Sequence, residues 1–353
     1  MKMMKAARWH AAKDIRIEET EIPTPKDNQV KIEVKFTGIC GSDLHEYRDG
    51  PQLIPVDNPF SLNGHQGTTT LGHEFSGVVE EVGKNVSNIK KGDRVTVEPI
   101  FRNPESPFIA SGEYNLSEPL GFVGLTANGG FAKHVVVEDY MVHKMPDAMT
   151  FEQGAIVEPA AVAAYAIQRS GMKLGDTVLV AGAGPIGMLT IQVALASGAS
   201  QIFVSDLSEN RLKKAKEIGA THTFDAKDKD ISKKIKEMTA YGVDIFIDAA
   251  GAQASFDTGI NSLRNGGTAV LVALFGKSVT HDALNQTLRE LTIIGTAAYR
   301  NIFPEVIALI SSGRLPVEKL ITSVISLDDI VEKGFEALVN DASEVKVLVD
   351  LNK

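Results

Sequence analysis

Three ligand types that bind transition metals occur in the first half of the chain, at Cys40, at His73 with Glu74, and at Glu158. A thiolate, an imidazole and a carboxylate suit Zn²⁺, and a catalytic zinc keeps three protein ligands and one position for water or substrate. Taken singly, a cysteine is usually a small buried apolar group, and a histidine usually belongs to the packing. Glu158 is different, because it lies in the apolar run 154–163, where a buried carboxylate without a partner would be costly. We therefore expect a metal or a hydrogen-bond donor beside Glu158.

A glycine-rich motif in the middle of the chain has the pattern of a dinucleotide site. The motif reads Gly182, Ala183, Gly184, Pro185, Ile186 and Gly187, and it follows an apolar stretch and opens a predicted helix. In that context the first glycine makes the turn, the second lets a pyrophosphate approach the backbone, and the third lets the helix pack on the strand. The N–H groups at the start of the helix then face the phosphates.

Asp206 ends the next predicted strand, about 20 residues after the motif, where a carboxylate accepts hydrogen bonds from an adenosine ribose. A 2′-phosphate on NADP would bring about two negative charges near it. One such charge pair at ~4 Å costs about 4 kcal/mol at an effective dielectric of about 20. The sequence therefore favours NAD. Arg211 leaves an alternative open, because an arginine there can accommodate a 2′-phosphate, although it could equally reach the ribose hydroxyls or point to solvent.

Composition excludes several classes of protein. The chain has 353 residues, of which 43% are hydrophobic and 23% charged, so we expect about two globular domains and no extensive disorder. Its single Cys permits neither an intramolecular disulfide nor a multi-cysteine structural zinc site, which favours the cytoplasm. A net charge of -9 has the wrong sign for a protein whose main partner is nucleic acid.

One uncharged stretch, 177–205, is long enough to cross a bilayer. The glycines and the proline of the motif interrupt it, which favours a strand, a tight turn and a buried helix instead. The segment 1–16 mixes charged and apolar residues and lacks the apolar run of a signal peptide. We expect no membrane partner.

The elements that must position these residues fall into two patterns. Up to about residue 150 the chain is predicted to be β-rich. The apolar residues alternate with period two at 30–36, and the apolar run 77–82 is followed at 91–95 by a Gly-Asp pair with the chemistry of a hairpin turn. A helix is predicted at 151–170, and the strands and helices that follow alternate as in a doubly wound parallel sheet. The strands of that sheet are predicted at 177–181, 201–205, 243–248, 268–273 and 291–294, with helices at 185–197 and 208–218. Beyond Gly295 we expect helices at 304–312 and 327–340 and a strand at 345–349. The predicted fold class is α/β, with a Rossmann domain (158–294) inserted into a β-rich domain (1–157 and 295–353).

Four segments together resemble the zinc-dependent medium-chain alcohol and polyol dehydrogenases: Gly38–Asp43, Gly72–Gly77, Glu158-Pro159 and Gly182–Gly187. The resemblance covers essentially the whole chain and implies that the β-rich domain is a GroES-like catalytic domain. Within the family the chain is most similar to the butanediol dehydrogenases, or acetoin reductases. That similarity lies in Val97–Phe101, Tyr114–Leu116, Leu120–Phe122 and Tyr299–Pro304.

The resemblance implies a role for each site residue. One zinc would be surrounded by Cys40, His73, Glu74 and Glu158. One of the two glutamates would bind the metal and the other would hydrogen-bond its water, and the sequence does not say which. Asp43 would orient His73 from behind. Ser42 and His45 match the proton relay of the family, although His45 could also be an ordinary surface histidine. Tyr299 and Arg300 would lie near the substrate.

The chain departs from many relatives in a lobe where four cysteines bind a structural zinc. The corresponding positions are Asn103, Ser106, Ile109 and Ser117. We therefore expect one catalytic zinc per chain and no structural zinc. The lobe must then be held by packing or by a neighbouring subunit.

The resemblance implies an NAD-dependent enzyme that oxidises a small secondary alcohol, (2R,3R)-2,3-butanediol to (R)-acetoin, and catalyses the reverse reduction. Zinc would act as a Lewis acid that lowers the pKa of the alcohol. Sorbitol, xylitol and threonine dehydrogenases are the enzyme alternatives, and a non-catalytic NAD-binding sensor is the alternative of another class. Homo-oligomers, dimers or tetramers, are the habit of the family.

Overall fold

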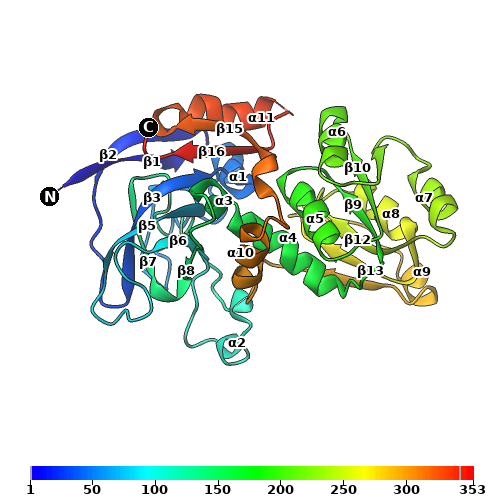
Figure 1. Cartoon of the computed structure of the whole chain (residues 1–353), viewed down its shortest axis with the longest axis horizontal. Coiled ribbons are helices and arrows are strands. Elements are labelled where there is room, and N and C mark those ends of the chain that lie inside the picture. The colour runs from blue at the N-terminus through cyan, green and yellow to red at the C-terminus, as the bar shows by residue number, and fades with distance from the viewer. Residues whose placement is uncertain (1, 342) are drawn as a thin grey trace. The chain divides into compact units, whose positions relative to one another are not determined.

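The computed structural model describes residues 2–341 and 343–353. It divides into two compact units. Figure 1 colours the chain by residue number, from blue at the N-terminus to red at the C-terminus. The first unit comprises Met1–Glu158, Phe303–Gly313 and Ile321–Lys353, and the second comprises Pro159–Ile302 and Arg314–Leu320. The division differs from the predicted one because residues 295–302 and 314–320 make their contacts within the second unit.

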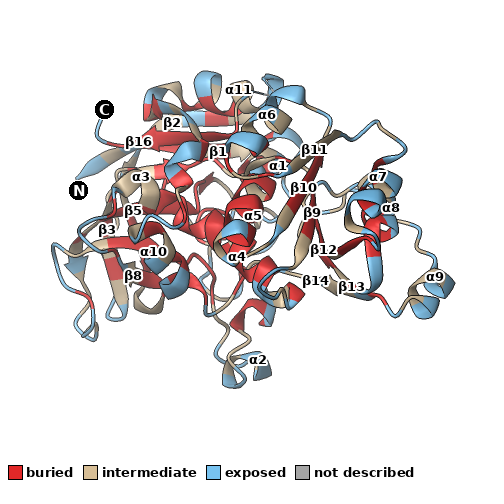
Figure 2. Cartoon of the chain, turned by 45° about the vertical axis from the view of Figure 1, so that its right-hand side comes forward, coloured by how far each residue is buried: buried red, intermediate tan, exposed pale blue. Residues whose placement is uncertain are grey.

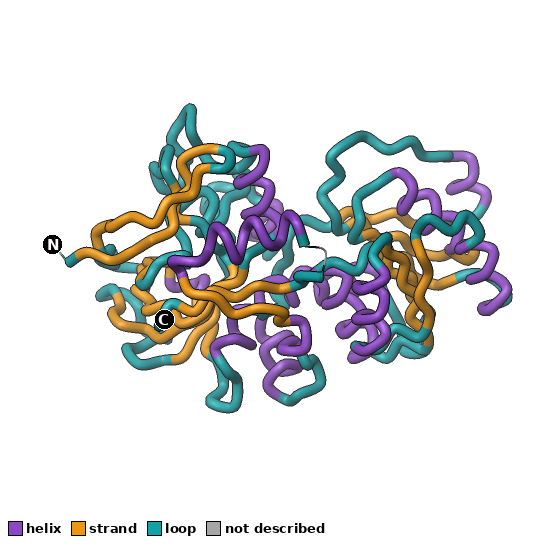
Figure 3. Tube along the Cα trace, turned by 90° about the horizontal axis from the view of Figure 1, so that it is seen from above, coloured by secondary structure: helices purple, strands orange, loops and turns teal. Residues whose placement is uncertain are grey.

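The first unit is built on two β-sheets. The larger sheet has the order β15 (Ile321–Ser326), β16 (Lys346–Asp350), β3 (Gln29–Gly38), β5 (Glu74–Val82), β6 (Arg94–Val97) and β8 (Val142–Lys144), and β7 (His134–Glu138) also pairs with β3. The smaller sheet has the order β2 (Asp14–Glu21), β1 (Met3–Ala11) and β4 (Thr69–Thr70). Strands β1 and β2 form an antiparallel ribbon that starts near the N-terminal label in Figure 3.

The alternating pattern at 30–36 correctly predicts β3, where Val30, Ile32 and Val34 are fully buried. The segment predicted as one helix over 327–340 is less regular. It contains a 3₁₀ turn (Leu327–Asp329), a π-helical stretch (Ile330–Glu336) and the short α11 (Ala337–Asn340). The other helices of this unit are α1 (Gly41–Asp49), α2 (Pro107–Ala110), α3 (Phe151–Ala155) and α10 (Phe303–Ser311).

The second unit contains the predicted parallel sheet. Its order is β11 (His222–Asp225), β10 (Gln201–Asp206), β9 (Thr177–Ala181), β12 (Val243–Asp248), β13 (Leu263–Leu271) and β14 (Thr292–Gly295), and all neighbouring pairs are parallel. The helices are α4 (Val157–Ser170), which begins at the unit boundary, α5 (Pro185–Ala196), α6 (Glu209–Glu217), α7 (Ile231–Thr239), α8 (Gln253–Ser262) and α9 (Ala283–Leu288). Strand β13 begins five residues before the predicted strand.

Burial explains why the uncharged stretch 177–205 is apolar. Four of the five residues of β9 are buried, as expected for a parallel strand covered on both faces. Most of α5 is buried as well, and its ribbon is largely red in Figure 2. Among the described residues, none of the helices combines the length and the apolar character that crossing a bilayer requires.

Candidate active site

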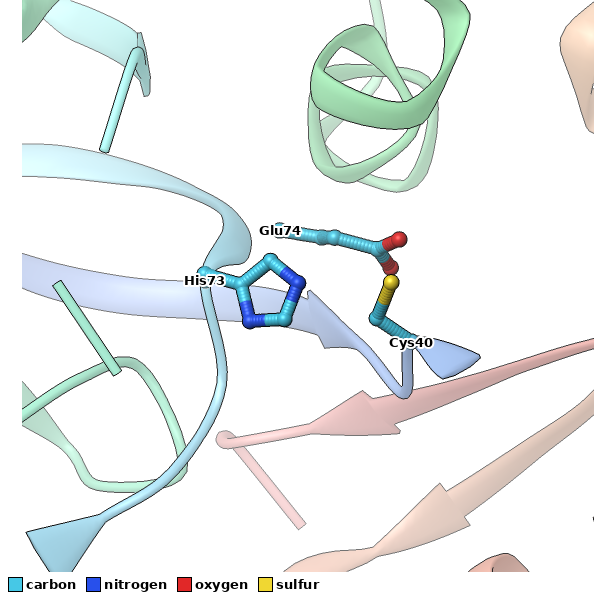
Figure 4. A group of neighbouring side chains, drawn as sticks. All are labelled: Cys40, His73 and Glu74. Carbon is cyan, nitrogen blue, oxygen red and sulfur yellow. The ribbon is translucent and has the colours of Figure 1, made fainter. Parts of the chain in front are cut away.

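The pairing of two strands brings the predicted zinc ligands together. Gly38 at the end of β3 is paired with Glu74 at the start of β5. The chain leaves β3 into α1 through Cys40, which is the N-cap of that helix, while His73 directly precedes β5. Ligand atoms of Cys40, His73 and Glu74, the ligand group, consequently lie within 4.8 Å of one another. Figure 4 shows these three side chains next to one another.

The chemistry of this group fits a divalent cation. His73 and Glu74 are 5% and 1% exposed, and the buried oxygen Oε1 of Glu74 has no hydrogen-bond partner in the described chain. Burial disfavours protonation of His73, but the charges of Asp43 and Cys40 outweigh it and raise the pKa of the imidazole well above its usual value. The surroundings therefore favour positive charge at the place where the three ligand atoms meet.

Asp43 orders the loops that carry two of the ligands. Its Oδ2 accepts a 2.9 Å hydrogen bond from the backbone N–H of Cys40, and its Oδ1 lies 3.4 Å from Nδ1 of His73. The same Oδ1 lies 3.4 Å from the backbone N–H of Gly72. A buried carboxylate against the far nitrogen of a ligating histidine is the usual arrangement behind a zinc ligand.

The two expected relay residues lie one turn apart on α1. Oγ of Ser42 is 3.1 Å from Nε2 of His73, so the hydroxyl lies beside the ligand group. His45 is exposed to solvent. The pair therefore extends from the candidate metal site to the surface of the first unit.

Glu158 and Lys346 complete the charged surroundings. Glu158 is 6% exposed and lies in the first turn of α4, but among the described residues the group of close ligand atoms does not include it. Lys346 is a buried lysine on β16 whose Nζ donates to Oε2 of Glu74. Burial disfavours its charged form, but the charges of Glu74 and Cys40 outweigh it, and that of Glu158 adds to them, so its pKa is raised.

The glycine-rich motif has the geometry of a dinucleotide turn. Gly182 follows β9 with φ of +89°, which favours glycine, and a Cβ there would lie 3.0 Å from the carbonyl group of Ala249. A Cβ on Gly187 would collide with the carbonyl oxygen of Gly182, so the helix can approach the strand only with glycine. A Cβ on Gly184 would meet nothing within 4 Å, which leaves space over the backbone at the start of α5. Pro185 and Ile186 begin that helix.

Asp206 ends β10 and contacts the glycine-rich turn. Its Oδ2 accepts a 2.7 Å hydrogen bond from the backbone N–H of Ala183, and its Oδ1 accepts one of 2.8 Å from that of Ser208. Each carboxylate oxygen keeps a second lone pair that could accept a ribose hydroxyl. Arg211 lies in the first turn of α6.

Tyr299 and Arg300 belong to the second unit. Tyr299 is fully buried, and the guanidinium of Arg300 lies 5.5 Å from the ring centroid of Tyr165. The ligand group lies in the first unit, so a role near the substrate stays a prediction.

Polar contacts hold the lobe in which many relatives have four cysteines. The side-chain amide of Asn103 donates to the carbonyl of Glu118, and Ser106 is the N-cap of α2. Buried Glu98 contacts this lobe through Tyr114, and the sequence analysis did not identify this contact. Its carboxylate accepts a 2.5 Å hydrogen bond from Tyr114 and lies 3.0 Å from Nε2 of His143 and 3.5 Å from Arg102.

Comparison with known proteins shows the family of the chain. Residues 26–147 match the family model of the alcohol dehydrogenase GroES-like domain, and residues 185–312 match that of the zinc-binding dehydrogenases. The chain is 45% identical to a curated (R,R)-butanediol dehydrogenase of Bacillus subtilis over 350 residues, which are 99% of this chain and 100% of the relative. It is 39% identical to human sorbitol dehydrogenase over 332 residues, 92% of this chain and 89% of the relative.

A crystal structure of 2R,3R-butanediol dehydrogenase from Bacillus subtilis superposes with a TM-score of 0.94 over 99% of this chain and 100% of that one, at 45% identity. The predicted fold class is thereby confirmed, with a GroES-like domain and a Rossmann-type dehydrogenase domain. By its motifs, its fold and these relatives, the chain belongs to the family of zinc-binding alcohol dehydrogenases.

Proposed function

We propose that this dehydrogenase oxidises (2R,3R)-2,3-butanediol to (R)-acetoin with NAD and catalyses the reverse reduction. The observation that carries the proposal is the close group of Cys40, His73 and Glu74 in a chain that matches a butanediol dehydrogenase over its full length. A non-catalytic NAD-binding protein would have no use for a close group of three metal ligands, two of them buried.

Cys40, His73 and Glu74 would hold a single catalytic zinc, which supplies Lewis acidity toward the alcohol oxygen when bound. Asp43 keeps Nδ1 of His73 turned away from the ligand group. Ser42, whose hydroxyl lies beside His73, would pass on the proton of the alcohol, and exposed His45 would deliver that proton to solvent. Glu158, whose charge acts on Lys346 beside these ligands, would hydrogen-bond the water on the metal.

For the cofactor, the carboxylate of Asp206 supports NAD over NADP, because a 2′-phosphate would be repelled by it. Gly184 leaves the backbone open to the pyrophosphate at the start of the helix that Pro185 and Ile186 begin. Gly182 makes the turn before it, and Gly187 lets the helix approach the strand. Arg211 keeps the NADP alternative open to test.

A panel of alcohols assayed by NADH absorbance tests the substrate. A vicinal diol has a second hydroxyl, and a site that hydrogen-bonds this hydroxyl discriminates strongly against alcohols that lack it. We expect kcat/KM for (2R,3R)-butanediol to exceed that for ethanol by orders of magnitude, with the (2S,3S) diol poor. Meso-butanediol should react at its R centre and give (S)-acetoin.

Sorbitol is the second candidate substrate, since the chain is 39% identical to human sorbitol dehydrogenase over most of its length. If sorbitol, xylitol or threonine is oxidised faster than the butanediols, the butanediol assignment fails and the zinc and NAD assignments stand. The single Cys supports a reducing compartment, the cytoplasm. The resemblance to the family supports a homo-oligomer, a dimer or a tetramer. The small-molecule substrate would be its main partner.

A further inference from the structure

Lys346 reaches the ligand group from the C-terminal strand. Strand β16 pairs with β3, with Leu348 opposite Gly38, and the backbone N–H of Ile39 donates to the carbonyl of Val347 over 3.1 Å. This pairing directs the Lys346 side chain, which is 2% exposed, toward Glu74. Its Nζ donates to Oε2 of Glu74 and to the carbonyl oxygen of Ile39, the latter over 3.3 Å.

The backbone around this ion pair leaves room for it. A Cβ on Gly38 would overlap Oε2 of Glu74 and would lie 3.0 Å from Cε and 3.2 Å from Nζ of Lys346. Gly38 has no positive φ, so its conformation does not require glycine. The missing side chain instead creates the space in which the ammonium and the carboxylate meet.

Stability alone is a weak explanation for this pair. Two buried charges lose their hydration, and replacing a buried ion pair by apolar residues of similar volume is often neutral or stabilising. The pair also holds only one of the two carboxylate oxygens of Glu74. Oε2 accepts from Lys346, whereas buried Oε1 has no hydrogen-bond partner among the described residues.

We propose that Lys346 is a positioning residue that occupies Oε2 of Glu74 and thereby restricts Glu74 to a single ligand atom, Oε1. A carboxylate can bind a metal through one oxygen or through both. With Oε2 held, Cys40, His73 and Glu74 provide three ligand atoms, which leaves the open position that a catalytic zinc needs for its substrate. The proposal rests on the zinc site of the proposed function.

The test is Lys346→Met in the full-length protein, with metal content and the visible spectrum of the cobalt-substituted protein as readouts. Methionine has a similar length and no charge. We expect about one zinc per chain to remain, because all three ligands are intact. The visible Co²⁺ absorption should weaken, since the coordination number rises when both oxygens of Glu74 bind. Turnover of the diol should fall about 10–100-fold, the usual cost of losing a residue behind a metal ligand.

Two further proteins make the result specific. In a Glu74→Gln background, where the amide offers one oxygen, adding Lys346→Met should leave the cobalt spectrum unchanged. Lys144→Met, which removes the ion pair of exposed Lys144 with half-buried Asp93 in the same unit, should leave spectrum and turnover unchanged. If Lys346→Met does not fold, Gly38→Ala decides instead. The added Cβ must displace Oε2 of Glu74 from Lys346, so the visible Co²⁺ absorption of this variant should weaken as well.

An unchanged cobalt spectrum in the folded variant would overturn the proposal and leave Lys346 a structural residue. Loss of zinc from Lys346→Met would overturn it as well, because Lys346 would then hold the site together and not limit Glu74. Either result leaves the proposed function intact if the unmodified protein binds zinc and oxidises the diol. A protein that takes up no zinc would instead refute the proposed function.

Discussion

The backbone N–H of Ala183 donates to Oδ2 of Asp206 over 2.7 Å, which joins the glycine-rich turn to the carboxylate at the end of the neighbouring strand. Asp206 therefore has two tasks. It fixes the turn over which the pyrophosphate would lie, and it places negative charge where the ribose of the cofactor would lie.

Replacing Asp206 with Ser should narrow the preference for NAD. If solvent screening halves the repulsion of a 2′-phosphate, the remaining ~2 kcal/mol per charge pair still implies more than tenfold preference in the unmodified enzyme. The variant loses this repulsion, and Arg211 then favours NADP. Values of kcat/KM for both cofactors measure the change.

Asp257 provides the control, since it is exposed on α8 and its carboxylate accepts from the side-chain amide of Gln253. Asp257→Ser should leave the cofactor ratio unchanged. Equal or better use of NADP by the unmodified enzyme would show that Asp206 does not face the ribose.

Cys40→Ala should abolish zinc binding and turnover while the protein stays folded. The thiolate is one of three ligands, whereas the half-buried side chain contributes little apolar volume to the packing. Metal analysis should give about one zinc per chain before the substitution and none after it, with little change in circular dichroism. Two tightly bound zincs in the unmodified protein, or full activity in the variant, would contradict the assignment.

Glu98→Gln should destabilise the first unit without removing the metal. The carboxylate of Glu98 accepts from Tyr114 and lies close to His143 and Arg102, whose guanidinium stacks 4.0 Å from the centroid of the Tyr114 ring. Removing the buried negative charge leaves these donors without their counter-charge, which should cost about 3 kcal/mol.

Thermal unfolding and metal content together test this prediction. The melting temperature should fall and the zinc content should stay at about one, because Glu98 is not in the ligand group. Exposed Glu105, in the same lobe, gives the control Glu105→Gln, for which we expect no change. An equal melting temperature in Glu98→Gln would show that the charge of Glu98 does not stabilise the first unit.

Local patterns predict much of the fold, because the residues that determine a strand or a turn are close in sequence. The alternation at 30–36 predicts β3, and the apolar runs at 177–181 and 201–205 predict β9 and β10. Where local signals compete, the prediction fails. The Ala-rich stretch 151–170 divides at Ile156 into α3 and α4, and 330–336 forms a π-helix.

The ligand types of the candidate site are visible in the sequence, but their partners are not. Lys346 lies 272 residues from Glu74, and only the pairing of β16 with β3 brings them together. A lysine within the apolar run 345–349 is the one local signal of this contact. Glu98 was likewise visible only as part of a family segment, since its donors lie at positions 102, 114 and 143.

Asp244→Asn should make the free energy of unfolding of the second unit depend less on pH in the acidic range. Oδ2 of Asp244 accepts from the backbone N–H and the hydroxyl of Thr177, both over 2.8 Å, and Oδ1 accepts from Arg264 over 2.6 Å. Burial raises the pKa of Asp244, but these hydrogen bonds outweigh it and lower the pKa from 3.8. A carboxyl whose pKa is lower in the folded protein adds stability above its unfolded pKa and loses it as pH falls through its folded pKa.

At pH 7 the asparagine variant should therefore be less stable than the unmodified protein by about 1–3 kcal/mol, the size of hydrogen bonds to a charged group. The difference should shrink below a pH of 3.8, where Asp244 itself becomes protonated and loses its charge. Urea unfolding followed by circular dichroism from pH 7 to about pH 3 measures both free energies. Exposed Asp257, which accepts from Gln253 on α8, gives the control Asp257→Asn. A difference that stays constant over this range would mean that the charge of Asp244 contributes nothing to stability and that only the geometry of its hydrogen bonds matters.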